Sequence, residues 1–161
     1  MLKSILSKDD CASCKFCCSF RRQSLWETPL FEKSIKESLE KRYPSARFKM
    51  VGNSRFTVDL LHLYKTKDPE EEAACPFLEK NGCVLNQDEK PFDCSIWPLR
   101  ICRVNEEFHV MLENTCPAIN KQPLQNVKNL AKSGLGERII AYAKEHPDST
   151  KEILPGFKIV Y

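Results

Sequence analysis

The sequence lacks any apolar run long enough for export or for crossing a membrane. Its first eight residues carry positive charge but no signal-peptide core. No other stretch approaches the about 20 consecutive apolar residues that a membrane-spanning helix needs. We therefore expect a cytoplasmic protein without membrane contact.

Recognisable nucleotide-binding and hydrolytic patterns are also missing. Gly134-Leu-Gly136 is too short for a G-x-G-x-x-G phosphate loop and does not follow a predicted strand. No grouping of serine, cysteine and carboxylate residues indicates a hydrolase. Whether the chain is catalytic by itself therefore stays open, as do its substrate and its oligomeric state.

The charge balance gives no support to a nucleic-acid partner. The formal net charge of +3 counts every cysteine as neutral. Metal ligation removes thiol protons, so eight ionised thiols around two divalent ions would turn this value slightly negative. We expect no nucleic-acid binding, whereas a protein partner is left open.

Cysteine is what the sequence has in excess, with nine in 161 residues, where a cytosolic domain of this length has about two or three. Four fall within eight residues, in Cys11-Ala-Ser-Cys14-Lys-Phe-Cys17-Cys18. C-x2-C spacing lets two thiolates of one short segment reach the same ion or cluster. An odd cysteine count without an export signal argues against a disulfide scaffold. The spacing therefore predicts a metal centre.

The rest of the chain supplies further thiols for this centre. Cys102 lies inside a predicted strand, and we expect it in the hydrophobic core. The predicted metal ligands are Cys11, Cys14, Cys17, Cys18, Cys75, Cys83, Cys94 and Cys116. All-sulfur sites suit zinc and iron alike, so the cofactor is an iron–sulfur cluster, expected as 4Fe–4S, or zinc. The division of the thiols among metal centres stays open.

Adjacent Cys17 and Cys18 argue against a simple ferredoxin-like loop. The first three cysteines match the C-x2-C-x2-C start of a bacterial ferredoxin run, but that run continues with x3-C-P. Successive side chains diverge on most backbones, so two adjacent cysteines seldom point at one ion. One of the pair serves a second centre, a different iron of the same cluster, or nothing.

Local patterns predict a small single α+β domain over residues 1–161, with short antiparallel hairpins, several helices and irregular cysteine-rich loops that hold the metal. A helix capped by Ser7, or a loop entering a helix, is expected within residues 7–20. Further helices are expected at 29–42, 122–133 and 137–146. Hairpins at 47–61 and 101–112 together suggest one antiparallel sheet, residues 155–161 a last edge strand, and residues 68–72 a solvated acidic linker.

The cysteine pattern resembles the YkgJ-type cysteine-cluster family, described as a zinc- or iron-chelating domain. The shared features are CxxCxxCC at residues 11–18, Cys75-Pro-Phe-Leu78, Gly82-Cys83, Lys90-Pro91-x2-Cys94-x2-Trp97-Pro98 and Cys116-Pro117. The family pattern has Arg, Ile-Tyr, Arg and Phe where this chain has Lys90, Val84-Leu85, Ser95 and Trp97. The thiols themselves are intact. The resemblance covers residues 11–117 and leaves 118–161 as a helical C-terminal extension.

The favoured hypothesis is a metal-binding protein whose N-terminal cluster and downstream cysteines chelate an iron–sulfur cluster or zinc. The resemblance extends to flagellin lysine methylases, which implies a more distant alternative. In that alternative the protein is an iron–sulfur-dependent redox or methyl-transfer enzyme, or an accessory to one. A third hypothesis is a protein-interaction module stabilised by zinc.

Overall fold

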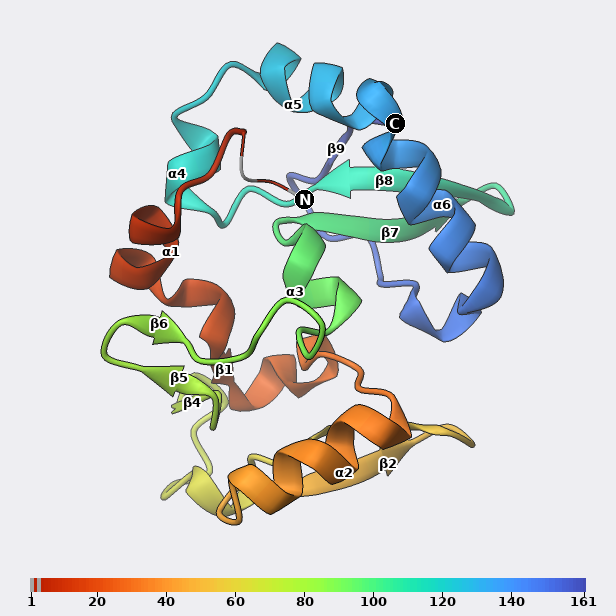
Figure 1. Cartoon of the computed structure of the whole chain (residues 1–161). Helices are drawn as coiled ribbons and strands as arrows, with labels where there is room; N and C mark the ends of the chain where they lie inside the picture. The colour runs from red at the N-terminus through yellow and green to blue at the C-terminus, as the bar shows by residue number, and fades with distance from the viewer. Residues whose placement is uncertain (1, 3) are drawn as a thin grey trace. The chain divides into compact units, whose positions relative to one another are not determined.

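The structure, a computed structural model that describes residues 2 and 4–161, is an α+β protein, as expected. Short antiparallel sheets alternate with helices along the chain (Figure 1). The chain divides into two compact units. Unit 1 comprises Met1–Cys14 and Ser95–Tyr161, and unit 2 comprises Lys15–Cys94. The expectation of one domain over residues 1–161 stays a prediction.

A hairpin and a helix form one part of unit 2. β2 (Phe48–Val51) pairs antiparallel with β3 (Arg55–Val58), and the turn between them has Gly52 at φ 60°. Glycine accepts this left-handed conformation without steric cost. α2 (Lys33–Arg42) packs against β3. The hairpin expected within residues 47–61 is confirmed.

The helix expected over residues 29–42 begins later than predicted, because Phe31 is extended. The Phe31 N–H donates to the carbonyl oxygen of Phe56 at 2.6 Å, and the Phe56 N–H donates back at 3.0 Å. α2 therefore starts only at Lys33, after an extended Glu32. The apolar spacing at the start of 29–42 reflects burial in an extended segment, so the prediction was wrong there.

Aromatic rings build the core of unit 2. Phe77 is fully buried, and its ring packs edge-on against Tyr43, with the ring centroids 5.4 Å apart. Phe31 lies 5.9 Å from Phe77 and 5.4 Å from Phe48 by the same measure. Removing a buried phenylalanine side chain typically costs about 3–5 kcal/mol. Phe77 belongs to the Cys75-Pro-Phe-Leu78 motif, so the core anchors this cysteine-bearing turn.

Two small two-stranded sheets complete unit 2. β1 (Ser19–Arg21) pairs with β4 (Glu72–Ala74), and β5 (Leu78–Glu79) pairs with β6 (Gly82–Cys83), all antiparallel. Short 3₁₀ helices lie at Phe16–Cys18, Arg22–Glu27 and Leu61–Leu63. α3 (Phe92–Ile96) begins at the end of this unit.

Unit 1 is built on a three-stranded antiparallel sheet in the order β7-β8-β9. β7 (Leu99–Val104) and β8 (Glu107–Leu112) form the hairpin expected within residues 101–112, and β9 (Lys158–Ile159) is the expected edge strand. The two predicted hairpins do not share one sheet, however. β2–β3 is a separate sheet in unit 2, because alternation indicates a strand but not its partner.

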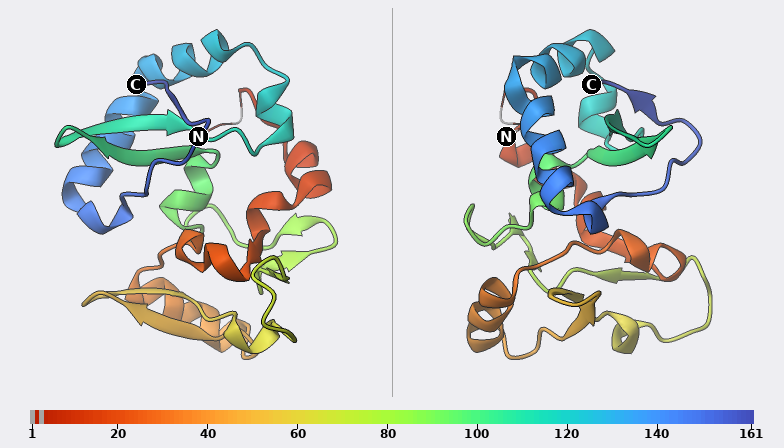
Figure 2. Two further views of the ribbon diagram at one scale, coloured as in Figure 1. Left: turned by 180° about the vertical axis from the view of Figure 1, so that it is seen from behind. Right: turned by 90° about the vertical axis from the view of Figure 1, so that its right-hand side faces the viewer.

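Helices surround this sheet in unit 1. α6 (Gly136–Glu145) packs on β7 and β8 (Figures 1 and 2), with Ile139 and Ala143 fully buried. The other segments are α1 (Lys8–Cys14), α4 (Pro117–Asn120), α5 (Leu124–Leu130), a π-helical turn at Ala131–Leu135 and a 3₁₀ helix at Pro147–Ser149. The two C-terminal helices are confirmed within a few residues. Among the described residues, no helix combines the length and the apolar character needed to cross a membrane.

Candidate metal centre

A change in backbone conformation divides the N-terminal cysteine cluster. Cys11 and Cys14 lie on α1, which ends at Cys14, and Lys15 then adopts a left-handed conformation at φ 55°. Cys17 and Cys18 follow in the 3₁₀ helix Phe16–Cys18. The first two cysteines belong to unit 1 and the next two to unit 2.

The start of α1 follows the predicted capping. The Asp10 N–H donates to Ser7 Oγ at 3.0 Å, while the Ser7 hydroxyl and N–H donate to Asp10 Oδ2 at 2.6 and 3.2 Å. This reciprocal arrangement is a capping box. The hydrogen bonds from Ser7 lower the pKa of the Asp10 carboxyl. Cys11 and Cys14 are exposed on the helix that this box begins.

The β1–β4 ladder brings Cys18 next to Cys75. Cys18 directly precedes β1, and Cys75 directly follows β4. Ser19 pairs with Ala74 at this end of the ladder, and the Cys75 N–H donates to the Cys18 carbonyl oxygen at 2.7 Å. Two cysteines more than fifty residues apart in the sequence are therefore neighbours through the backbone.

Cys83 returns to the same region through a tight hairpin. The Leu78 N–H donates to the Cys75 carbonyl oxygen at 3.0 Å, which closes a turn at the Cys-Pro-Phe-Leu motif. Leu78 then pairs with Cys83 in β5–β6, and the Val84 N–H donates to the Phe77 carbonyl oxygen at 3.0 Å. Gly82, the first residue of β6, has a left-handed conformation at φ 101°.

Cys94 is close to these thiols. Burial raises the pKa of Cys94 well above its usual value, and nearby negative charges add to the effect. These charges belong, in decreasing order of influence, to Cys75, Asp93, Cys17 and Cys83. Cys94 therefore lies within electrostatic range of three further predicted ligands. We call Cys17, Cys75, Cys83 and Cys94 the thiol cluster.

The pKa values of two other members of the thiol cluster, Cys17 and Cys75, are raised as well. Burial, with smaller contributions from Cys83 and Cys17, raises the pKa of Cys75 to about 12 against an opposing backbone hydrogen bond from Phe77. A contact with the Cys18 thiol, at an Sγ–Sγ distance of 4.0 Å, raises the pKa of Cys17, and so do burial and the Cys18 charge. The thiols of Cys17, Cys75 and Cys94 are therefore neutral at pH 7 until a cation offsets the cost of their ionised forms.

Two residues near the thiol cluster were not among the predicted site residues. The positive charge of Lys90 opposes the rise in the pKa of Cys17. Asp93 is buried beside Cys94 in α3, and its Oδ2 atom has no hydrogen-bond partner among the described residues. Neither residue has a local sequence signal, since lysine and aspartate are common and only the fold places them here.

The remaining predicted ligands lie in unit 1. Cys116 is buried directly before α4, whereas Cys11 and Cys14 are exposed on α1. The Gln122 amide donates to the Ile5 carbonyl oxygen at 3.2 Å, and the Lys121 charge lowers the pKa of Asp10 slightly. These contacts connect the N-terminal segment with the region after α4. Cys102, expected in the core, is completely buried in β7.

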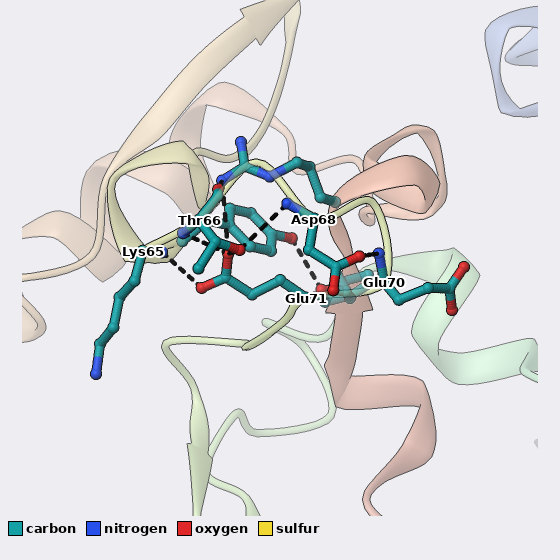
Figure 3. A network of polar contacts seen from close by, with 8 residues as sticks. Lys65, Thr66, Asp68, Glu70 and Glu71 are labelled. Carbon is teal, nitrogen blue, oxygen red and sulfur yellow. Dashed lines mark hydrogen bonds and ion pairs between the residues drawn. The ribbon is translucent and has the colours of Figure 1, made fainter.

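Residues 68–72 are more ordered than the solvated acidic linker that the sequence suggested. Glu71 accepts hydrogen bonds from Lys65 and Thr66 and pairs with Arg22 (Figure 3). These interactions, the Thr66 hydroxyl first, lower the pKa of Glu71 to about 2. Glu72 is the first residue of β4. Asp68, Pro69, Glu70 and Glu72 are exposed, as expected of a solvated segment, whereas the partners of Glu71 could not be predicted from its composition.

Among the described residues, no set of three or more His, Cys, Asp or Glu side chains is arranged so that it could hold a metal ion. No protein-family model, curated protein or solved structure matches the chain.

Proposed function

We propose that this protein binds a metal through the thiolates of Cys17, Cys75, Cys83 and Cys94. The observation that carries the proposal is the gathering of these thiols from four segments: a 3₁₀ helix, the Cys-Pro-Phe-Leu turn, β6 and α3. Thiolates that repel one another are disfavoured when they are brought together without a cation. A divalent ion or an iron–sulfur cluster turns this repulsion into attraction.

The donor set fits either metal of the sequence-based hypothesis. Zinc and iron–sulfur clusters both accept four thiolate ligands, and tetrahedral zinc holds them at about 2.3 Å. Binding requires the four side chains to close on the metal and to release their protons. The backbone N–H of Phe77 already favours the thiolate form of Cys75. Hydrogen bonds to ligand sulfurs of this kind tune the centre when it is bound.

Our wider proposal keeps the other sequence-based assignments. Cys11, Cys14, Cys18 and Cys116 are candidates for further ligands of the same or a second centre. Relationship to the YkgJ-type family would explain the motif set, and a reducing cytoplasm would keep so many thiols available for metal.

Metal analysis of single variants tests the proposed ligands. Each of Cys75→Ser and Cys94→Ser should lower the bound zinc or iron per chain, because an incomplete thiolate set holds the metal weakly. Cys102→Ala is the matched control, since Cys102 is a buried cysteine outside the thiol cluster. Metal content is measured by elemental analysis of protein purified without oxygen. The control should keep the wild-type stoichiometry.

Two outcomes would contradict the proposal. One is wild-type protein that contains no metal and takes up neither zinc nor iron. The other is unchanged stoichiometry in both ligand variants. An absorption spectrum of the same material separates the metals, because an iron–sulfur protein is brown and a zinc protein is colourless.

A further inference from the structure

The β1–β4 ladder has an inner end, next to Cys18 and Cys75, and an outer end, at Arg21 and Glu72. At its inner end, Cys18 and Cys75 are joined by the backbone hydrogen bond of 2.7 Å. The three residue pairs of the ladder lead from there to Arg21 opposite Glu72. Beyond this outer end the strands do not separate, because Arg22 N–H donates to the Glu71 carbonyl oxygen at 3.0 Å. The geometry of the outer end therefore influences the separation of the two cysteine-bearing segments.

Near this outer end, both oxygens of the Glu71 carboxylate accept hydrogen bonds from the loop before β4 (Figure 3). Oε1 accepts a hydrogen bond from the Lys65 N–H at 2.5 Å. Oε2 accepts from the Thr66 N–H at 2.7 Å and from the Thr66 hydroxyl at 2.6 Å. We call Glu71 with Arg22, Lys65 and Thr66 the carboxylate clamp. It joins the loop before β4 to the residue after β1.

Arg22 contributes the other half of the clamp. Its guanidinium lies 3.8 Å from Glu71 Oε2 and donates to the Thr66 carbonyl oxygen. It also lies over the Tyr64 ring, 4.6 Å from the centroid, while the Tyr64 hydroxyl donates to the Phe20 carbonyl oxygen at 2.8 Å. These bonds hold β1 and the 64–71 loop as one block, next to the ladder that carries Cys18 and Cys75.

We propose that Glu71 is a positioning residue for the thiol cluster. By fixing the outer end of the β1–β4 ladder, the clamp holds the Cys17–Cys18 segment against Cys75 before metal arrives. This inference rests on the proposed function. When the backbone segments that carry the ligands are already held together, less conformational freedom is lost on binding and the ion binds more tightly. Groups that orient metal ligands typically change metal affinity by about 10–100-fold when they are removed.

Cobalt binding to the full-length Glu71→Gln protein tests the proposal. Glutamine keeps the size of the side chain but places an amide where the carboxylate accepts hydrogen bonds. We expect the Kd for Co²⁺ to rise about tenfold, with an unchanged thiolate-to-cobalt absorption spectrum at saturation. The titration is run where circular dichroism shows both proteins fully folded. A purely stabilising role would lower the denaturation midpoint and leave this Kd unchanged.

Glu37→Gln is the matched control, since Glu37 carries the same charge in the same unit. It lies on α2, outside both the clamp and the β1–β4 ladder, with an exposed side chain 4.0 Å from Lys33. Its Kd should stay at the wild-type value. Thr66→Val removes the hydroxyl that donates to Glu71 and accepts from the Asp68 N–H, and should raise the Kd about threefold. If the Glu71 variant does not fold, this milder variant tests whether the clamp positions the thiol cluster.

The possible results separate this inference from the function on which it rests. A wild-type protein that binds neither Co²⁺ nor Zn²⁺ overturns both. A wild-type protein that binds Co²⁺, with the same Kd in the Glu71 variant, overturns the positioning role alone. An equal rise in the Glu71 and Glu37 variants also overturns it, because the effect would then follow from net charge. If only the clamp variants bind more weakly, the inference is supported.

Discussion

Glu113 and Asp93 are the two buried carboxylates among the described residues, and they differ in their hydrogen-bond partners. Glu113 accepts hydrogen bonds from Arg100 at 2.9 Å and from the Thr115 hydroxyl at 3.0 Å. One oxygen of Asp93 has no hydrogen-bond partner in the described chain. Because a buried charge depends on its partners, removing these two negative charges should have different consequences.

We expect Glu113→Gln to lower the free energy of unfolding of the metal-free protein by about 3 kcal/mol, because it leaves Arg100 buried without its counter-charge. Asp93→Asn should cost nothing, or should stabilise the protein by up to about 1 kcal/mol, because it removes an incompletely satisfied charge. Urea denaturation of both variants measures the difference. Equal destabilisation would contradict this account of their surroundings.

The two hairpins could be predicted from the sequence because the strands and the turn of each hairpin are neighbours along the chain. Alternation around a turn located β2–β3 and β7–β8, and the Ser7 capping box marked the start of α1. The extended conformation of Phe31 depends on Phe56, and the order of Glu71 depends on Arg22. Both pairs are distant in the sequence. A pattern that covers one segment cannot identify such partners, so the sequence misplaced the start of α2 and gave no sign of the Glu71 contacts.

The turn of the β7–β8 hairpin contains local strain that can be tested. Val104 pairs with Glu107, and the two turn residues Asn105 and Glu106 have φ of 48° and 66°. Asparagine tolerates a left-handed conformation, whereas glutamate does so at a cost. We expect Glu106→Gly to raise the free energy of unfolding by about 0.5–1 kcal/mol. Thermal denaturation provides the measurement.

Glu106→Ala is the control for this turn. It removes the same exposed side chain, including the 3.6 Å pair with Arg103, but keeps the Cβ atom. It should therefore bring no stabilisation. A glycine variant no more stable than the alanine variant would show that the positive φ carries no measurable strain.

Across the whole molecule, cysteine spacing did not predict which thiols lie near one another. The sequence placed Cys11 to Cys18 together, yet α1 ends between the two pairs. Cys17 is instead close to Cys75 and Cys94, because the β1–β4 ladder and α3 place them there. The sequence left open how the thiols divide among metal centres, and strand pairing is what brings Cys18 next to Cys75.

The nine cysteines should therefore differ in reactivity in a way that maps the site. In metal-free protein at pH 7.5, we expect iodoacetamide to label the exposed Cys11 and Cys14 first and the completely buried Cys102 only slowly. Burial raises the pKa of Cys102 from 9.0 to about 11, which lowers its thiolate fraction about a hundredfold. Labelling of folded protein at Cys102 should rise only as the pH approaches 11. Mass spectrometry of peptides measures each site.

Adding Zn²⁺ before the label completes this experiment. Cys17, Cys75, Cys83 and Cys94 should become protected, because a coordinated thiolate no longer attacks the reagent, whereas Cys102 should label as slowly as before. Protection of Cys11, Cys14 and Cys116 as well would assign them to a metal too, as their spacing predicts. Chelation of the zinc should restore labelling of the thiol cluster. If Cys75 and Cys94 label at the same rate with and without metal, they are not its ligands.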